Sequence, residues 1–373
     1  MMHRQPGEGS SHCDDITARR RSPRGDRAQR AYPSMDTLPD HLDMPAGELV
    51  DRENRHLNYL RVSITDRCNL RCIYCVPEGR IPKLAHDDIL SYEEILRLVT
   101  VGTGLGIRKV RITGGEPLVR KGVLDLLRHL THMPGLDDVS LTTNGVLLTD
   151  RAQEVYDAGV HRINISLDTL DRTKYAHITG YNQFDRVWAG IEHARAIGFA
   201  PIKINVVAMR GINDDEILDF GRLSQETPFH IRFIEYMPIG NSRTSSKDQI
   251  LTPEIRERIA VLGPLTPINN GRDDGPARRY RLAGAQGEIG FISALSDHFC
   301  QRCNRLRLTA DGKLRACLLS DSYFSVKEAL RSNAPDHELA DIFRAAVRQK
   351  AQRHQLCSRG VSPVKDQMQG IGG

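Results

Sequence analysis

The sequence predicts an α/β fold: an incomplete (β/α)6 TIM-like barrel followed by a C-terminal α+β extension. Two observations indicate this fold. Short strands alternate with amphipathic helices from about residue 58 to residue 236, and within the strands apolar residues alternate with polar ones. A strand buried on both faces of a parallel sheet is apolar throughout, so the polar residues must face a shared interior. Because they include Arg and Lys, we expect an open barrel that admits an anionic ligand.

Each strand and helix is placed by its periodicity. In the first strand Val62 and Ile64 alternate with Arg61, Ser63 and Thr65; the next four strands repeat this pattern, and the sixth is less regular. The six predicted strands span residues 59–65, 109–113, 139–144, 162–168, 202–207 and 230–236. Helices are predicted between them at residues 91–103, 120–131, 150–158, 184–197 and 214–226.

The chain after residue 240 is less regular. We expect loops at residues 241–246 and 269–276 with a helix near residues 253–261, then a hairpin over residues 304–318 that turns at Asp311-Gly312. Helices near residues 323–331 and 336–353 follow. These patterns divide the chain into a disordered leader (residues 1–50), the partial barrel with the first cysteine triplet (51–268), and a C-terminal region (269–373).

Bulk composition restricts the class of protein. With 27% charged and 39% hydrophobic residues, the chain is typical of a soluble globular protein. It shows neither a signal peptide nor an apolar run long enough to span a bilayer, so we expect a cytoplasmic protein with no membrane partner. A formal charge of +5 is small for 373 residues and does not indicate nucleic-acid binding.

Six of the eight cysteines fall into two triplets. In a chain without a signal peptide, such clusters are typical of metal ligands in a reducing compartment. Three thiolates are one short of a closed zinc site or an all-cysteine cubane, so each triplet leaves one metal position open. The triplets are Cys68, Cys72 and Cys75 (C-x3-C-x2-C), and Cys300, Cys303 and Cys317 (C-x2-C-x13-C).

The first triplet, with Tyr74 before its last cysteine, resembles the signature of the radical S-adenosylmethionine (SAM) superfamily. Gly114-Gly115-Glu116-Pro117, after the second strand, resembles the segment of that superfamily that contacts the methionine amino group of SAM. The second triplet, the two arginines that follow Cys303 (Arg305 and Arg307) and the Gly-Gly end resemble the GTP 3',8-cyclase family, whose members catalyse the first step of molybdenum cofactor biosynthesis.

The resemblance implies a role for each matching residue. The two triplets would hold two [4Fe-4S] clusters, the first binding SAM and the second facing the purine. The SAM pocket would include Tyr74, Gly115, Ser166 and Met237. Arg61, Gly372 and Gly373 would be catalytic, the last two as a tail threaded into the site. The nucleotide would contact Arg61, Arg111, Thr142, Lys203, Arg305 and Arg307, of which the first four also belong to the polar strand faces.

In the family reaction, a 5'-deoxyadenosyl radical takes hydrogen from ribose C3' of GTP, and the carbon radical attacks guanine C8. The resemblance further implies a flavodoxin- or ferredoxin-type reductant and a downstream cyclic pyranopterin monophosphate synthase, and it allows a homodimer. Two alternatives stay open at this point: a peptide-modifying radical SAM enzyme with an auxiliary cluster, and a zinc-stabilised binding module.

Overall fold

The computed structural model describes residues 47–76, 83–240, 243–269, 271, 275–354 and 364–372. Most of the expected leader lies outside this part of the chain. Near the C-terminal end of this leader, however, Leu49 is buried. The backbone N–H of Leu49 donates to the carbonyl of Leu105 at 3.1 Å. The packed fold therefore begins slightly before the expected boundary at residue 50.

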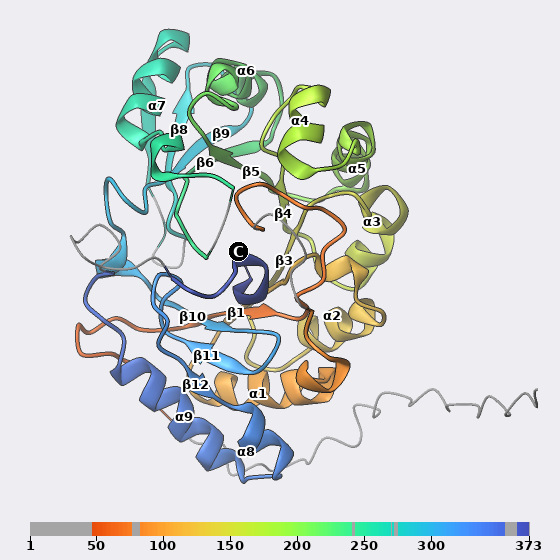
Figure 1. The fold of residues 1–373 in the computed structure, drawn as a ribbon, viewed down its shortest axis with the longest axis vertical. Helices are drawn as coiled ribbons and strands as arrows, with labels where there is room; N and C mark the ends of the chain where they lie inside the picture. Colours follow the sequence, from red (N-terminus) through yellow and green to blue (C-terminus); the bar gives the residue numbers. More distant parts are fainter. Residues whose placement is uncertain are drawn as a thin grey trace, which may run out of the picture. The chain divides into compact units, whose positions relative to one another are not determined.

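All twelve strands form one sheet, in the order β12-β11-β10-β1-β2-β3-β4-β5-β6-β9-β8-β7 (Figure 1). Its centre consists of six parallel strands in chain order, as the sequence predicts. The sheet ends at β12 and β7 and is therefore open, which is consistent with the expected TIM-like α/β fold. The central strands are β1 (Tyr59–Ser63), β2 (Lys109–Thr113), β3 (Asp138–Thr143), β4 (Ile163–Ser166), β5 (Ile202–Ala208) and β6 (His230–Glu235).

The helices that connect these strands lie along the outer side of the sheet (Figure 1). The sequence analysis missed α4 because it is short and buries only Tyr175, Ile178 and Thr179, which gives a weak apolar pattern. No helix among the described residues is long and apolar enough to cross a membrane. The helices are α1 (Tyr92–Gly104), α2 (Val123–Thr131), α3 (Leu148–Asp157), α4 (Arg172–Thr179), α5 (Phe184–Ile197) and α6 (Ile217–Glu226).

The C-terminal region extends the sheet at both ends. On one side β9 (Glu288–Ile292) pairs with β6 and continues through β8 (Arg278–Leu282) to β7 (Leu265–Ile268), after α7 (Thr252–Ile259). These three strands were not predicted. On the other side β10 (Arg305–Leu308) runs parallel to β1 and forms the expected hairpin with β11 (Lys313–Arg315).

The end of the chain differs from the prediction in its helix boundaries. Residues Phe324–Ser325 form strand β12 against β11, so the helix expected from residue 323 begins later, as α8 (Lys327–Arg331). The next helix, α9 (Asp336–Arg348), ends five residues before the predicted position. A last short helix, α10 (Met368–Ile371), was not predicted.

The two faces of the central strands separate as their alternation predicts. The apolar residues Val62, Val110, Leu141 and Ile163 have no exposed surface. Their polar neighbours in the sequence line a cavity instead. The fold therefore positions a charged interior on the inner side of the curved sheet.

Candidate active site

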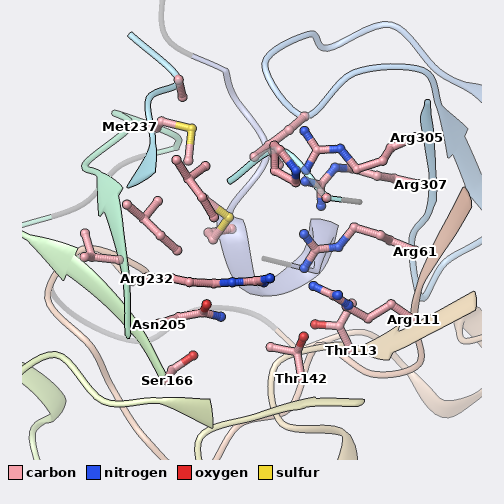
Figure 2. A pocket seen from close by; sticks show the side chains of 18 of the residues that line it. Arg61, Arg111, Thr113, Thr142, Ser166, Asn205, Arg232, Met237, Arg305 and Arg307 are labelled. Carbon is pink, nitrogen blue, oxygen red and sulfur yellow. The ribbon is translucent and has the colours of Figure 1, made fainter. Parts of the chain in front are cut away.

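One cavity brings together the residues that the sequence analysis singled out. It is lined from β1 to β6 and from the C-terminal region, and side chains from both converge on it (Figure 2). Gly373 lies outside the described residues. The predicted residues that line the cavity are Arg61, Cys68, Cys72, Tyr74, Cys75, Arg111, Gly115, Thr142, Ser166, Lys203, Met237, Cys300, Cys303, Arg305, Arg307 and Cys317.

The first cysteine triplet lies on the loop after β1. The backbone N–H of Arg71 donates to Thr179 and that of Ile73 to Ile178, which fixes the loop on α4. Burial is the largest cause that raises the pKa of Cys72 well above its usual value and that of Cys75 to about 12. Thiolates here therefore need a cationic partner such as iron to offset the loss of water.

The arrangement of the described cysteines does not match a site for a single metal ion. Among the described residues, no group of three or more His, Cys, Asp or Glu side chains is arranged to hold one metal ion. A cubane is larger than an ion and spaces its three thiolates further apart. All six cysteines of the two triplets are free thiols, so each triplet remains available to ligate three corners of a cluster.

Glu116 fixes the loops beside the first triplet. It is fully buried, and its carboxylate accepts hydrogen bonds from the N–H of Leu118 (3.0 Å), the hydroxyl of Thr143 (2.8 Å) and the N–H of Asn144 (2.7 Å). Burial raises its pKa to about 7. Glu116 thus ties the loop after β2 to the loop after β3, and does not itself line the cavity.

Gly115 lets two loops approach closely. Its N–H donates to Thr65 at 2.7 Å, and a Cβ at this position would lie 2.4 Å from the carbonyl oxygen of Arg67. No other residue could occupy this position without moving the backbone. The Gly-Gly segment therefore lies directly against the loop that carries the first cysteines.

Asp168 is a cavity residue that the sequence analysis did not propose. The hydroxyl of Tyr74 donates to its Oδ2 at 2.7 Å, and the N–H of Val207 donates to its Oδ1 at 2.8 Å. Burial raises its pKa to about 6 although both hydrogen bonds favour the charged form. Its place at the polar end of the predicted fourth strand was the signal that could have found it.

Several buried polar side-chain atoms lack a hydrogen-bond partner among the described residues. They include the hydroxyls of Tyr59 and Thr142 and the side-chain oxygen of Asn205, and these three residues line the cavity; Figure 2 labels Thr142 and Asn205. Buried polar groups are normally hydrogen-bonded. Their arrangement therefore fits a polar ligand in this part of the cavity.

Positive charge is concentrated in the same cavity. Burial and the charges of Arg307 and Arg111 lower the pKa of Arg61 well below its usual value, and burial with Arg305 lowers that of Arg307 to about 9. Burial, followed by Arg232 and Arg111, lowers the pKa of Lys203 to about 7. Buried cations that also repel one another match a polyanion such as a triphosphate.

Two further cations belong to this group. Lys109 and Arg232 line the cavity, and Figure 2 shows Arg232 reaching from β6 across the cavity toward Arg61 and Arg111. Lys109 was on the polar face of the second strand but was not proposed as a ligand. Arg232 was missed because the sixth strand does not alternate regularly.

The second triplet adjoins these cations through sheet pairing. Strand β10 follows Cys303 and pairs with β1, which places Arg307 directly beside Arg61. Cys317 follows β11, the other arm of the hairpin. Burial raises the pKa of Cys303, but the charges of Arg305 and Lys350 outweigh burial and bring this pKa to about 6.

Comparison with known proteins identifies the family. Residues 62–223 match the model of the Radical SAM superfamily, and residues 229–356 match the model described as Molybdenum Cofactor Synthesis C. The GTP 3',8-cyclase of Moorella thermoacetica is 52% identical over 306 residues, which cover 82% of this chain and 95% of the relative. That of Heliobacterium modesticaldum is 48% identical over 327 residues, covering 87% and 100%.

The chain belongs to the GTP 3',8-cyclase family. Membership of the radical SAM superfamily implies a [4Fe-4S] cluster and SAM, and the first triplet has the cysteines for this cluster. Among solved structures, Streptococcus suis SuiB has a TM-score of 0.54 at 16% identity, over 79% of this chain and 69% of SuiB. At this identity the likeness shows a common fold alone. The family assignment sets aside the peptide-modifying and zinc-module alternatives.

The C-terminal tail of this family member reaches the cavity cations. Figure 1 shows α10 at the centre of the barrel opening, where Ile371 packs with Ile239 and Val364. Arg307 donates to the carbonyl oxygen of Gly372 at 2.7 Å. Gly372 has φ +81°, and a Cβ there would lie 2.7 Å from Thr113 Cγ2. The glycine at this position is therefore required both by its backbone conformation and by space.

Proposed function

We propose that this chain converts GTP to (8S)-3',8-cyclo-7,8-dihydroguanosine 5'-triphosphate, the first step of molybdenum cofactor biosynthesis, with both cysteine triplets holding [4Fe-4S] clusters. The observation that carries this proposal is that both triplets and the cationic group line one cavity. Two small molecules can then meet there, each bound to the open iron of a different cluster.

The first triplet and its surroundings would hold SAM. With SAM bound, the first cluster supplies the 5'-deoxyadenosyl radical that removes hydrogen from ribose C3'. Tyr74 is oriented by its hydrogen bond to Asp168, and Gly115 is held against the cysteine loop. Together with Ser166 and Met237 they line the same cavity, so they would orient SAM toward the substrate.

The cations would divide between the two ends of GTP. Lys203, Arg232 and Arg111 lie on β5, β6 and β2, each separated from β10 by at least one strand of the sheet, and would hold the triphosphate. Arg305 and Arg307 lie on β10, directly after Cys303, and would flank the guanine at the second cluster. Arg and Lys bind phosphate oxygens through charge-assisted hydrogen bonds, so this arrangement fixes the orientation of GTP.

Arg61 and the C-terminal glycines would act where the two ends meet. Arg61 lies beside Arg307 in the paired strands, and Arg307 binds the carbonyl of Gly372. The tail would hold these guanidinium groups in position and exclude water from the radical, whose reactions with solvent must be prevented. Gly373, which lies outside the described residues, would act together with Gly372 as a catalytic residue.

The proposal includes partners that follow from the family. A flavodoxin- or ferredoxin-type protein would supply one electron to the first cluster, and a cyclic pyranopterin monophosphate synthase would consume the product. The enzyme would work in the cytoplasm, where these partners occur, and as a homodimer.

The test is anaerobic turnover with SAM, reductant and GTP carrying deuterium at C3'. Cyclisation moves the C3' hydrogen of GTP to 5'-deoxyadenosine, and the cyclised radical then takes one electron from the reductant and one proton from solvent. The unlabelled product therefore has the mass of GTP, and it is recognised by its chromatographic retention and by the loss of the aromatic C8–H signal. The deuterium should appear in 5'-deoxyadenosine, and GTP labelled at C2' should give none. SAM cleavage without deuterium transfer from C3' would contradict the proposal.

A further inference from the structure

A buried ammonium group lies beside the second cysteine triplet. Lys350, two residues after α9, is only 6% exposed. Its Nζ lies 3.6 Å from Cys303 Sγ, 3.0 Å from the carbonyl oxygen of Arg305 and 2.5 Å from that of Ala316. None of these contacts, which are those found within the described residues, is a carboxylate. The sulfur is therefore the group among them that can carry a compensating negative charge.

The two carbonyl groups belong to different cysteine-bearing segments. Arg305 follows Cys303 by two residues on β10, whereas Ala316 directly precedes Cys317 at the end of β11. A single ammonium group thus bridges both arms of the hairpin, at residues close in sequence to Cys303 and Cys317. This bridge joins the segment that carries Cys303 to the segment that carries Cys317.

The segment that carries Lys350 is itself fixed to the triplet. The guanidinium of Arg55, which is buried, donates to the carbonyl of Cys300 at 2.6 Å and to that of Ala351 at 2.8 Å. The backbone N–H of His354 donates to the sulfur of Cys300. Residues 349–354 are therefore tied by hydrogen bonds to the second triplet.

A buried cation needs an anion nearby, because an unpaired charge is costly to remove from water. Three thiolates on an iron–sulfur cluster supply negative charge at this place. Hydrogen bonds and positive charge at ligand sulfurs stabilise the reduced cluster more than the oxidised one, because reduction adds an electron.

We propose that Lys350 is a positioning residue for the second cluster: it holds Cys303 and Cys317 at the separation that a cubane needs, and its charge raises the reduction potential of that cluster. This inference rests on the proposed second cluster. It assigns the potential to a residue of the C-terminal region that is not part of the cavity lining. A lysine that only joined two strands would affect stability but would leave the potential unchanged.

The experiment compares anaerobically reconstituted holoenzyme with Lys350→Met, Lys350→Gln and, as a control, Lys327→Met. Lys327 lies on α8 and pairs with Asp88 at 2.9 Å, away from both triplets. Iron and sulfide per chain are measured first. A redox titration followed by electron paramagnetic resonance then gives the potential of each cluster, the second being the component that SAM does not alter.

For Lys350→Met we expect the equilibrium constant for reduction of the second cluster to fall about tenfold. This corresponds to a reduction potential lower by ~59 mV for a one-electron step. The potential of the first cluster should not change. Lys350→Gln, which keeps the donors but not the charge, should shift the potential in the same direction, and the control should match wild type. Unshifted potentials, or loss of both clusters together, would overturn the role of Lys350. Wild type with only about four irons would overturn the second cluster itself.

Discussion

Lys203 gives the cavity a pH dependence that can be worked out from the structure. It lies on β5 among other cations, and burial, followed by the charges of Arg232 and Arg111, lowers its pKa to about 7. A bound triphosphate would oppose these effects and return the pKa toward its ordinary value, ~10.4. GTP binding should therefore take up a proton at Lys203 in the pH range where the free protein has lost it.

The sign and size follow from this shift. With a free-state pKa of about 7, the protonated fraction of Lys203 falls from about nine-tenths at pH 6 to about one-tenth at pH 8. The association constant for GTP should therefore fall about tenfold over this range, or ~1.4 kcal/mol. Below pH 6 the contribution levels off. Burial also lowers the pKa of the neighbouring His230, to about 4, so His230 stays neutral throughout.

The assay is anaerobic titration calorimetry of GTP binding without reductant, at pH 6, 7 and 8. Two buffers with different ionisation enthalpies at each pH give the number of protons taken up. Lys203→Met is the matched control. It removes the lysine, whereas any pH dependence that comes from protonation of GTP itself is the same for both proteins. In the variant, the roughly tenfold decrease of the GTP association constant between pH 6 and pH 8 that is due to Lys203 should be absent. An equal dependence and equal proton uptake in wild type and variant would refute the reasoning.

Three further predictions concern the tail, the second triplet and the buried carboxylate. Gly372→Ala should abolish cyclisation at normal iron content because its Cβ has no room, whereas Gly370→Ala, with no atom within 4 Å, should remain active; equal turnover by both would contradict this. Cys300→Ala should still cleave SAM but form no cyclised nucleotide, as chromatography would show, unless the second cluster has no role. Glu116→Gln should lower the free energy of unfolding by ~1–3 kcal/mol above pH 7, because an amide cannot accept hydrogen bonds from all three donors. Urea unfolding measures this change, and an unchanged midpoint would contradict it.

Much of the cavity could be predicted from local sequence because strand periodicity is a local property. Arg61, Arg111, Thr142 and Lys203 each alternate with apolar neighbours, and the structure places all four on the inner face. The spacing of the cysteines indicated two sets of metal ligands, and the family resemblance added the C-terminal arginines, which no periodicity indicates. Strand periodicity and the family resemblance indicate the same residues in the part of the sheet where parallel strands follow one another in chain order.

The features that were missed depend on contacts between distant segments. Strand β6 lies between β5 and β9, and burial on both of its faces removes the alternation that would have indicated Arg232. The contact of Lys350 with Cys303 joins residues 47 positions apart, and no local pattern at residue 350 predicts it. Strand β12 pairs with β11, and this tertiary pairing replaces the first turn of the helix expected there.

The most direct test of the account is the iron and acid-labile sulfide content of anaerobically reconstituted wild type, Cys72→Ala and Cys300→Ala. If each triplet holds its own cubane, wild type should bind about eight irons and eight sulfides and each variant about four. About four irons in wild type, or zinc in place of iron at either triplet, would contradict it.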